Sequence, residues 1–515
     1  MRNIGIDFGT CNLKGAERKK NGDITYVKLG KSIDKPRIPN VILYEKNEDG
    51  TTTCIGDVAS RKPKPEQDKI RNVKSFLQEE KWNRKLSFGE SVSAYQATKD
   101  IMKSLFDEIH NTNKNEDISA TITVPVNFSK RQRMMIENAV ECAGFEVKAT
   151  ITEPFASVFY LMNENIVDEE DNHDVLVFDF GGGTLDLCLV SIKHKNGITN
   201  VETKATIGIT YGGNNINTVI LEKIVRKQAK DEIERAIDNE PNVLHQAVNN
   251  YFVTEAINDL KADLFEDDDV DADESRSLMV QLYDGNVVNL GDVSIDQIYR
   301  LFDEEGFAER IPNLLIKLFE DCDVTPDEVT DIFMIGGTSS IPYFRDRLIE
   351  FFTKYNNPYI DDIFELNDDM DRDERVFSSV SMGAVAYSEL LDDEDVMIKD
   401  KIPFYVYSKN STGGRETRLD INSGCCSPYA PLLDSMKSDG KIAVYQTVFG
   451  EDEKEVFLGY IELDDEITEY ATLFKLSANA NRNIVATFAY MMDGEDEPSD
   501  EWEKEVYISI EGGNS

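Results

Sequence analysis

A glycine-turn motif that occurs twice constrains the fold of this chain more than any other feature. Residues 4–10 read IGIDFGT and residues 176–184 read LVFDFGGGT, so that Asp179 follows Asp7 by 172 residues. Each copy passes from a short apolar strand through an aspartate and a glycine turn to a threonine and a further strand. The two copies predict one hairpin in each half of a pseudo-symmetric α/β unit, with the hairpins facing each other across a cleft.

The remaining pattern divides the 515 residues into two regions. Up to about residue 391, short apolar runs alternate with helical periodicity, which is typical of layered α/β structure. The strands expected there are Ile4–Asp7, Ala120–Val124, Val175–Asp179 and Asp331–Ile335, and the helices are Lys130–Ala143, Asn217–Lys230, Ile298–Glu320 and Tyr343–Phe352. From residue 402 onward, alternating apolar and polar positions between glycine-containing turns predict an all-β domain. The strands expected in that domain are Phe404–Tyr407, Lys441–Phe449, Val456–Leu463, Ile484–Tyr490 and Val506–Ile510.

Composition restricts the classes of function. The chain carries 98 acidic and 55 basic residues, a formal net charge of −43, whereas sequence-independent binding to nucleic acid or anionic lipid requires clustered Lys and Arg. No apolar run approaches the roughly 18 residues of a membrane span, and the N-terminal residues lack the apolar segment of a secretion signal. The seven cysteines include no C-x-x-C pair, which is typical of a reducing compartment. We therefore expect a cytoplasmic protein with no nucleic-acid or membrane partner.

The two hairpins have the chemistry of a phosphate clamp. A glycine turn lets backbone N–H groups approach an anion without obstruction from a Cβ atom. Asp7 and Asp179 repel phosphate directly, but they can hold Mg²⁺ through its retained waters, and the metal can bridge phosphate oxygens. Thr10 and Thr184 offer hydroxyls that could orient an attacking water. Either copy alone fits an ordinary tight β-turn equally well; the pair favours the phosphate site.

Two further glycine turns follow strands and precede helices. Residues 335–342 read IGGTSSIP, and residues 211–214 read YGGN. Each offers a helix N-terminus and a close backbone approach to a nucleotide, although each alone fits a plain connection between a strand and a helix. Neither has the spacing of a Walker loop.

These motifs together resemble the heat-shock protein 70 (DnaK-like) chaperone family of the actin/hexokinase nucleotide-binding superfamily. The matching stretches are IGIDFGT (4–10), ITVPVNFSKRQRMMIENAVECAGFEV (122–147), TEPFAS (152–157), VFDFGGGTLDL (177–187), YGGN and IGGTSSIP. The resemblance implies an actin-like two-lobed ATPase domain (1–390), an interdomain linker (391–401) and a β-sandwich peptide-binding domain (402–515). The last range is too short to add a helical lid.

The resemblance also implies roles for particular residues. Lys74 matches the catalytic lysine, and Glu153 matches the carboxylate that helps to place the attacking water; Thr184 and Asp179 complete the expected catalytic set. Without the resemblance, Lys74 reads as a surface lysine and Glu153 as a carboxylate favoured at a helix start. Asp7 and Asp179 are the expected magnesium residues, acting through waters. The positions expected to contact ATP or ADP are Gly9, Thr10, Cys11, Asn12, Gly181, Gly182, Gly183, Gly212, Gly213, Lys261, Gly336, Gly337 and Thr338.

Several positions depart from the family pattern. On the adenosine side only Lys261 of the usual helix motif remains, beside Asn258 and Ala262, and Ser340 and Phe377 stand where an arginine and an aspartate are usual. We therefore expect a looser nucleotide site that is less selective for adenine. In the linker, Lys399 replaces a leucine after the apolar triplet 396–398, which could dock on the ATPase domain or form an edge strand of the β domain. In the β domain, Thr412 and Ala443 replace larger apolar residues.

The sequence therefore predicts a lid-less chaperone of the heat-shock 70 type, which couples slow Mg-ATP hydrolysis to transient binding of extended peptides. Its expected partners are unfolded polypeptide, a J-domain co-chaperone and a nucleotide exchange factor. Two alternatives stay open. One is a nucleotide-dependent scaffold with vestigial hydrolysis that grips a dedicated partner, and the other is a small-molecule kinase of the same superfamily.

Overall fold

The structure is a computed structural model of the chain. It describes residues 2–507 except 30–36, 49, 63, 78, 80, 111–116, 168–171, 266–272, 321, 369, 371, 392, 401–403, 410–414, 420–428, 449–453, 479–483 and 491–502. Thr412 and the side chain of Phe377 lie outside the described part. Within it, no helix is long and apolar enough to cross a membrane.

The first hairpin lies in the centre of a mixed sheet. Its strand order is β11-β10-β1-β2-β3, with β4 also paired to β2. Strand β1 pairs in parallel with β10 and antiparallel with β2, and all seven residues of β10 are buried. The bounds are β1 (Arg2–Phe8), β2 (Asn12–Arg18), β3 (Ile24–Tyr26), β4 (Arg37–Pro39), β10 (Ile118–Val124) and β11 (Glu146–Thr152).

The second hairpin occupies the same place in a second sheet. That sheet has the order β17-β12-β13-β14-β18, in which β12 pairs in parallel with β17 and antiparallel with β13. The bounds are β12 (His173–Phe180), β13 (Leu185–Lys195), β14 (Ile198–Ile209), β17 (Asp331–Ile335) and β18 (Val396–Lys399). Each hairpin is thus a strand, a glycine turn and a returning strand beside one parallel neighbour.

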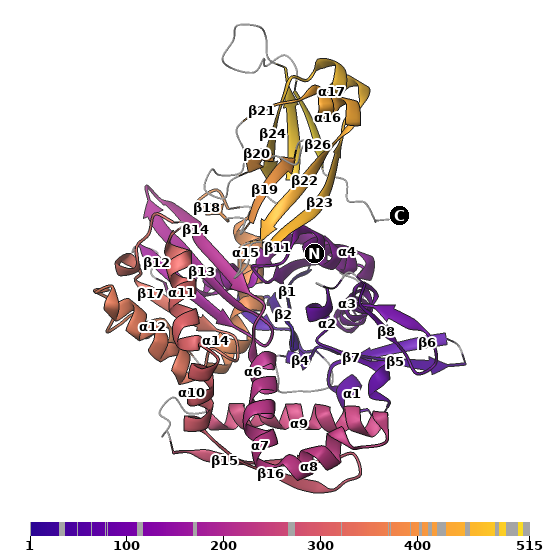
Figure 1. Cartoon of the computed structure of the whole chain (residues 1–515). Helices are drawn as coiled ribbons and strands as arrows, with labels where there is room; N and C mark the ends of the chain where they lie inside the picture. The colour runs from indigo at the N-terminus through magenta and orange to yellow at the C-terminus, as the bar shows by residue number, and fades with distance from the viewer. Residues whose placement is uncertain are drawn as a thin grey trace.

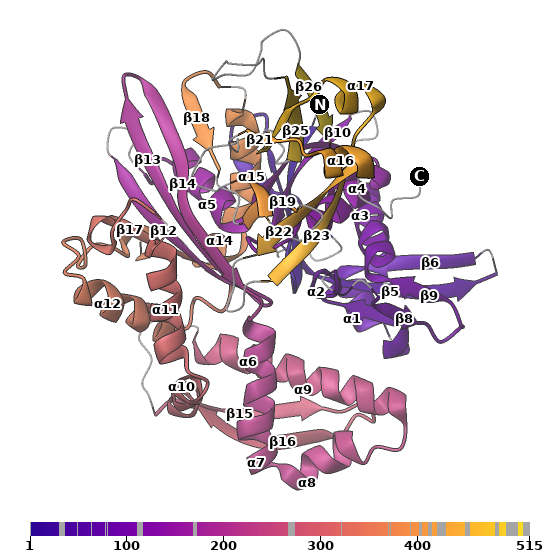
Figure 2. The same ribbon diagram turned by 45° about the horizontal axis from the view of Figure 1, so that its top comes forward.

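Two helices pack against each other between the sheets (Figures 1 and 2). Helix α5 (Glu153–Asn163) packs on β12 and β13, and α15 (Ser379–Leu390) packs on β1 and β2. Glycine permits this close crossing, because a methyl group added at Gly383 of α15 would collide with the carbonyl oxygen of Ala156 in α5. A methyl group added at Gly5 of β1 would likewise collide with the carbonyl oxygen of Ser381 in α15.

Each sheet carries an outer extension, and the two extensions project away from the β-rich end of the molecule (Figure 1). We call the first sheet with its extension the first lobe, and the second sheet with its extension the second lobe. The remaining elements of the first lobe are β5 (Val41–Asn47), β6 (Gly50–Ile55), α1 (Gly56–Arg61), β7 (Lys69–Arg71), α2 (Val73–Phe76), β8 (Asn83–Lys85), β9 (Ser91–Ser93), α3 (Ala94–His110) and α4 (Lys130–Ala143). Those of the second lobe are α6 (Gly213–Ile220), α7 (Arg226–Gln228), α8 (Lys230–Ile233), α9 (Val243–Leu264), β15 (Ser275–Gln281), β16 (Val287–Ser294), α10 (Ile295–Glu304), α11 (Phe307–Glu320), α12 (Pro342–Lys354), α13 (Glu365–Asp368) and α14 (Arg372–Phe377).

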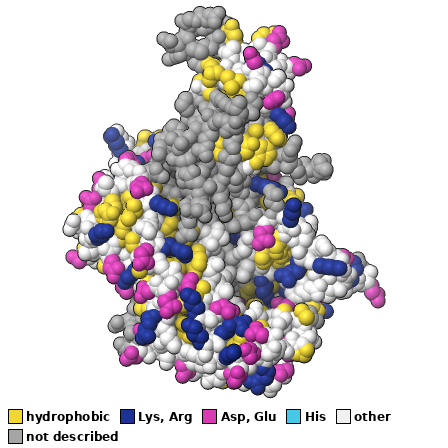
Figure 3. Space-filling view, viewed as in Figure 1, with side chains coloured by type: hydrophobic (Ala, Val, Ile, Leu, Met, Phe, Trp, Pro, Cys, Tyr) yellow, Lys and Arg dark blue, Asp and Glu magenta, His cyan; other side chains and the backbone are white. Residues whose placement is uncertain are grey.

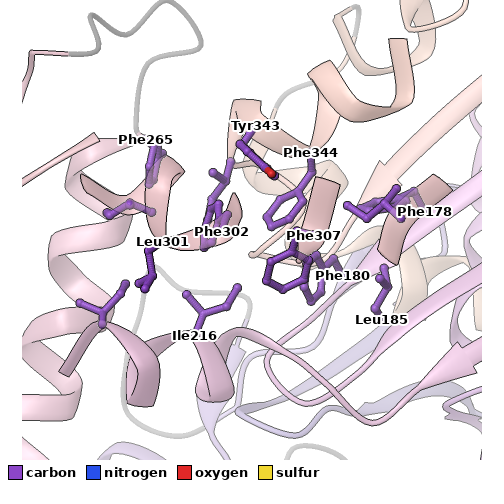
Figure 4. Packing of buried hydrophobic residues seen from close by; sticks show 14 of the residues in the cluster. Phe178, Phe180, Leu185, Ile216, Phe265, Leu301, Phe302, Phe307, Tyr343 and Phe344 are labelled. Carbon is purple, nitrogen blue, oxygen red and sulfur yellow. The ribbon is translucent and has the colours of Figure 1, made fainter. Parts of the chain in front are cut away.

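Side chains alternate along β12, so its aromatic residues and its aspartate lie on opposite faces of the sheet. Phe178 and Phe180 point into an aromatic cluster with Phe302, Phe307 and Phe344, which come from α10, α11 and α12 (Figure 4). Because successive side chains of a strand point to opposite faces, Asp179 is directed to the face that α5 covers.

Two of the expected helices differ from the prediction. The range Ile298–Glu320 was expected as one helix, but it belongs to α10 and α11, which are separated at Gly306 with φ of 77°. The range Asn217–Lys230 is also interrupted, by a π-helical turn over Leu221–Val225. Helix α4 starts at the predicted residue because Ser129 and Gln132 form a capping box.

Acidic and basic side chains are interspersed on the outer extension of the second lobe (Figure 3). Arg226 pairs with Glu222 and Asp238, and Lys223 pairs with Glu305. Exposed pairs of this kind contribute little to stability.

The β-rich region contains two four-stranded antiparallel sheets with the orders β20-β19-β22-β23 and β21-β24-β25-β26. Apolar side chains of both sheets, among them Val444, Ile461, Phe474 and Phe488, form one buried cluster. The expectation of an all-β region is wrong in one respect: α16 and α17, of six residues each, connect strands there. The bounds are β19 (Phe404–Lys409), β20 (Arg415–Leu419), β21 (Ala430–Pro431), α16 (Asp434–Asp439), β22 (Lys441–Val448), β23 (Lys454–Glu462), α17 (Asp465–Tyr470), β24 (Leu473–Ala478), β25 (Ile484–Ala489) and β26 (Glu503–Tyr507).

The apolar segment before this region is a strand of the second lobe. Strand β18 pairs in parallel with β14 over Thr199–Glu202, and the Thr203 hydroxyl donates to Asp400 at 3.0 Å. Of the two expectations for this segment, docking on the α/β region that precedes it therefore agrees with the structure, and an edge strand of the β domain does not.

The crossing of α5 and α15 generates a prediction for stability. We expect Gly383→Ala to lower the free energy of unfolding by about 3 kcal/mol, because the methyl group forces two packed helices apart. Urea unfolding followed by circular dichroism measures the change. Gly337→Ala is the matched control, since a methyl group there meets nothing within 4 Å. Equal stability of the two variants would contradict the prediction.

Candidate functional site

The glycine turns of the two hairpins touch each other. A methyl group added at Gly183 would lie 2.5 Å from Thr10 Oγ1, and one added at Gly182 would collide with Cys11 Sγ. The first turn is held by Asn40, whose side-chain amide donates to the Gly9 carbonyl at 2.8 Å. The structure therefore brings together the two motifs that stand 172 residues apart in the sequence.

The other two glycine turns join the second hairpin. The Gly213 and Asn214 amides donate to the carbonyls of Gly181 and Gly182 at 3.0 and 2.9 Å. The Thr338 hydroxyl donates to the Gly181 carbonyl at 3.0 Å. A methyl group added at Gly212 would collide with the backbone of Gly182–Gly183.

Two separate features of the third glycine turn require glycine at position 336. Its φ of 82° favours glycine, and a methyl group there would lie 2.7 Å from Asp179 Oδ1. By contrast, Gly337 has open space on its Cβ side, next to the Thr338 turn. The predicted glycines thus form one continuous backbone surface made from both lobes.

Asp7 and Asp179 lie at the same end of their strands. They are 3% and 7% exposed, and the charge of Asp7 is one of the causes that raise the pKa of Asp179. Burial is the largest cause of that shift, followed by Glu153 and Asp186. Like charges so placed disfavour ionisation, and a bound cation would relieve the repulsion.

Lys74 and Glu153 form a buried ion pair. Lys74 lies in α2, which follows Asn72 in the left-handed conformation, and its side chain is 2% exposed. Glu153 is the first residue of α5. Burial raises the pKa of Glu153, and the ammonium group of Lys74 opposes the shift. Lys74 is therefore not a surface lysine, and both residues face the aspartates.

Sequence reasoning did not single out Asp186. It lies directly opposite Asp179 in the β12–β13 pair and is fully buried. Burial, aided by the charge of Glu153, raises its pKa to about 7. Neither carboxylate oxygen accepts a hydrogen bond of good geometry from the described residues. The available signal was a charge inside the apolar run LDLCLV (185–190), directly after the glycine turn.

Sequence reasoning also passed over Lys14. It faces Asp7 across the β1–β2 pair, and its Nζ atom lies 2.7 Å from Asp7 Oδ2. Its charge also opposes the rise in the pKa of Asp179 and of Glu153 that burial causes. Asp7, expected to be available to a metal, is thus already paired with a cation of the chain.

The adenosine-side residues gather around α9. Lys261 Nζ donates to the Gly213 carbonyl at 3.4 Å, and burial lowers its pKa to about 8. Cys11 Sγ lies 3.4 Å from Asn214 Oδ1, and burial raises the pKa of this thiol. Asn12 begins β2 beside the first glycine turn and pairs with Pro39 of β4. Ser340 Oγ donates to the Gly337 carbonyl.

A contact between the two lobes spans the outer end of the cleft. The Arg71 guanidinium lies 3.5 Å from the ring centroid of Tyr251, a residue of α9. The Tyr251 hydroxyl is 3.2 Å from Ser60 Oγ, to which Arg71 also donates. This cation–π contact joins β7 and α1 of the first lobe to the second lobe.

The carboxylates suit Mg²⁺, which prefers oxygen ligands and keeps several waters. The buried carboxylate of Asp186 is close to Thr184 and to the Val126 backbone, and its oxygens are of the kind that a hydrated ion of this type accepts. Within the described residues, no group of three or more His, Cys, Asp or Glu side chains could hold a metal alone. The carboxylates of Asp7, Asp179 and Asp186 are oxygen donors of the type that would suit a hydrated magnesium ion.

Asp186 generates a pH prediction for the protein without nucleotide or metal. The pKa of Asp186 is raised from 3.8 to about 7 in the folded state. The free energy of unfolding is therefore highest below pH 4 and falls as the pH rises to 7, because Asp186 ionises first in the unfolded chain. We expect the free energy of unfolding of Asp186→Asn to exceed that of the wild type by about 2 to 4 kcal/mol at pH 8 and to match it near pH 4. Urea unfolding at both pH values measures this difference. Asp107→Asn, on the exposed face of α3, controls for the loss of one charge; the same pH-independent change in both variants would contradict the prediction.

Comparison with known protein families agrees with this geometry. Residues 4–465, which contain all four glycine turns, the buried carboxylates and most of the β-rich region, match the family described as Hsp70 protein. The match covers well over half of the 515 residues. The resemblance inferred from the motifs is confirmed: this chain belongs to the Hsp70 family of ATP-dependent chaperones.

Proposed function

We propose that this chain hydrolyses ATP slowly in the cleft between its lobes and uses the nucleotide to control transient binding of extended peptide by its β-rich region. The observation that carries the proposal is the meeting of both glycine hairpins beside the buried Lys74–Glu153 pair. Backbone amides, carboxylates and a lysine then surround one space, as phosphoryl transfer to water requires.

The glycine turns bind the phosphates. The turns at Gly9–Cys11 and Gly182–Gly183 come from opposite lobes and lie in contact, so a triphosphate bound to their backbone N–H groups would hold the lobes together. Asp7 and Asp179 would hold Mg²⁺ through its waters, and a bound ion would neutralise part of the phosphate charge. The chain itself provides the positions of these groups before the nucleotide arrives.

The buried acids orient the attacking water. Thr184 and Glu153 offer oxygens that accept its hydrogens, and Lys74 fixes the Glu153 carboxylate in place. Asp186, with a pKa of about 7, accepts a proton near neutral pH. Because these groups are buried away from bulk water, the local dielectric constant is low and each of these interactions is stronger.

The β18 segment provides a route from the cleft to the β-rich region. It extends the sheet that contains β12 and β13, so a change in that sheet alters its docking surface. We propose the domain limits 1–390, 391–401 and 402–515, with a peptide-binding β-sandwich in the last of these ranges. A J-domain protein and a nucleotide exchange factor are the proposed partners, and the cytoplasm is the proposed location.

A scaffold with vestigial hydrolysis is the second candidate. Two observations favour it: the family match ends at residue 465, inside the β-rich region, and Lys14 already occupies one carboxylate of the cleft. ATP turnover that rises when an unfolded peptide is added supports the chaperone. Nucleotide binding with no measurable turnover, together with capture of one folded partner, supports the scaffold.

The catalytic assignment generates a prediction for turnover. We expect Thr184→Ala and Lys74→Ala to lower the rate of phosphate release from ATP by about 100-fold, because each removes a group that positions water. Lys204→Met is the matched control, since Lys204 is also a buried, ion-paired lysine but lies on β14. Turnover of both cleft variants at the control rate would contradict the assignment.

The contact across the cleft generates a prediction for exchange. We expect Tyr251→Ala to speed ADP release by about 3- to 10-fold, because it removes a cation–π contact that closes the lobes. Stopped-flow displacement of a fluorescent ADP analogue measures the rate. Tyr251→Phe keeps the ring and loses only the hydroxyl, so its rate should stay close to that of the wild type. A slower or unchanged rate in Tyr251→Ala would contradict a closing role.

A further inference from the structure

The side chain of Lys14 places an ammonium group beside the proposed nucleotide site, and the proposed hydrolysis of ATP does not use this group. It lies on β2 directly opposite Asp7, on the face of the first sheet that α15 covers. The Lys14 side chain is 13% exposed, whereas that of Asp7 is 4% exposed. Lys14 is therefore the more exposed member of this pair.

The charge balance of the cleft shows what this lysine changes. Asp7, Glu153, Asp179 and Asp186 influence one another electrostatically, and the described lysines paired with them are Lys14 and Lys74. With every group ionised, these six side chains leave two negative charges uncompensated. Without Lys14 there would be three, and the repulsion of a triphosphate would be stronger.

The position of Lys14 is also set by the backbone. Lys14 and Asp7 are paired residues of one antiparallel ladder, so their side chains leave the sheet on the same face. Lys14 stands four residues after Thr10, at the end of the first glycine turn. Its charge reaches across the cleft, because it opposes the rise in the pKa of Asp179 on the second hairpin that burial causes.

We propose that Lys14 binds nucleotide phosphate as a built-in cation and makes nucleotide binding partly independent of Mg²⁺. The inference rests on the proposed nucleotide site and adds one residue to it. The ammonium group stays hydrogen-bonded to Asp7 and donates a further hydrogen bond to a phosphate oxygen. Because Lys14 contacts Asp7 Oδ2, Asp7 Oδ1 and Asp179 would remain to hold Mg²⁺ through its waters.

A purely structural role makes a different prediction. If Lys14 only neutralises Asp7, removing both charges together restores a neutral site that binds ADP as the wild type does. If Lys14 binds phosphate, the double variant keeps the defect, since its side chains supply no cation at that place. The double variant Asp7→Asn with Lys14→Met therefore separates the two roles.

The experiment is calorimetric titration of the full chain with ADP, once in excess Mg²⁺ and once in EDTA. We expect the wild type to lose less than about tenfold in affinity without Mg²⁺. In EDTA, Lys14→Met and the double variant should bind ADP about 10- to 100-fold more weakly than the wild type, the range for one hydrogen bond to a charged group. Lys14→Arg should stay close to the wild type, and Lys204→Met is the control with a similarly buried, ion-paired lysine.

Each outcome supports or overturns the proposal. Wild-type affinity in EDTA for the double variant overturns it in favour of simple neutralisation, and the same Mg²⁺ dependence in the wild type and Lys14→Met overturns it as well. If either result is found but the wild type still binds nucleotide in Mg²⁺, the role of Lys14 is wrong and the proposed function is unaffected. Absence of ADP binding in both buffers overturns the proposed function and this inference together. Thermal unfolding of each variant identifies any that do not fold; the double variant, which leaves no unpaired charge, decides the matter if Lys14→Met unfolds.

Discussion

Four buried carboxylate groups, those of Asp7, Glu153, Asp179 and Asp186, repel one another where the two lobes meet, and the rest of the structure depends on how they are held there. Burial and mutual repulsion raise the pKa values of Glu153, Asp179 and Asp186, so this arrangement opposes folding. Two lysine ammonium groups offset part of the repulsion, and the aromatic cluster behind β12 and the packed sheets supply the remaining stability. The unfavourable charge lies where a metal ion and phosphates would relieve it, so ligand binding should also stabilise the folded chain.

The position of the cleft follows from close backbone packing. Helices α5 and α15 cross at Gly383, and the two hairpins touch at Gly182 and Gly183. Side chains larger than hydrogen at these points would separate the lobes and move Asp7 away from Asp179. The same two helices lie against both sheets, which gives a mechanical connection between the lobes. Strand β18 extends this connection to the β-rich region through its pairing with β14.

Local patterns were sufficient to predict much of the fold. The hairpin strands, α4 and most strands of the β-rich region follow from alternation, capping and turn residues, which act over a few positions. The prediction was wrong where a local pattern was ambiguous. Continuous periodicity across 298–320 hid the break at Gly306, and the short helices α16 and α17 carry too few residues to show a period.

Sequence by itself determined the family, the two glycine hairpins and the candidate residues on them, because these depend on residue type and spacing along the chain. Only the tertiary structure decided which charges meet. It buried Lys74 against Glu153, placed Asp186 opposite Asp179 and paired Lys14 with Asp7. Strand register and helix crossing set these contacts, and a residue's charge environment depends on neighbours that are distant in sequence, which a linear pattern does not contain.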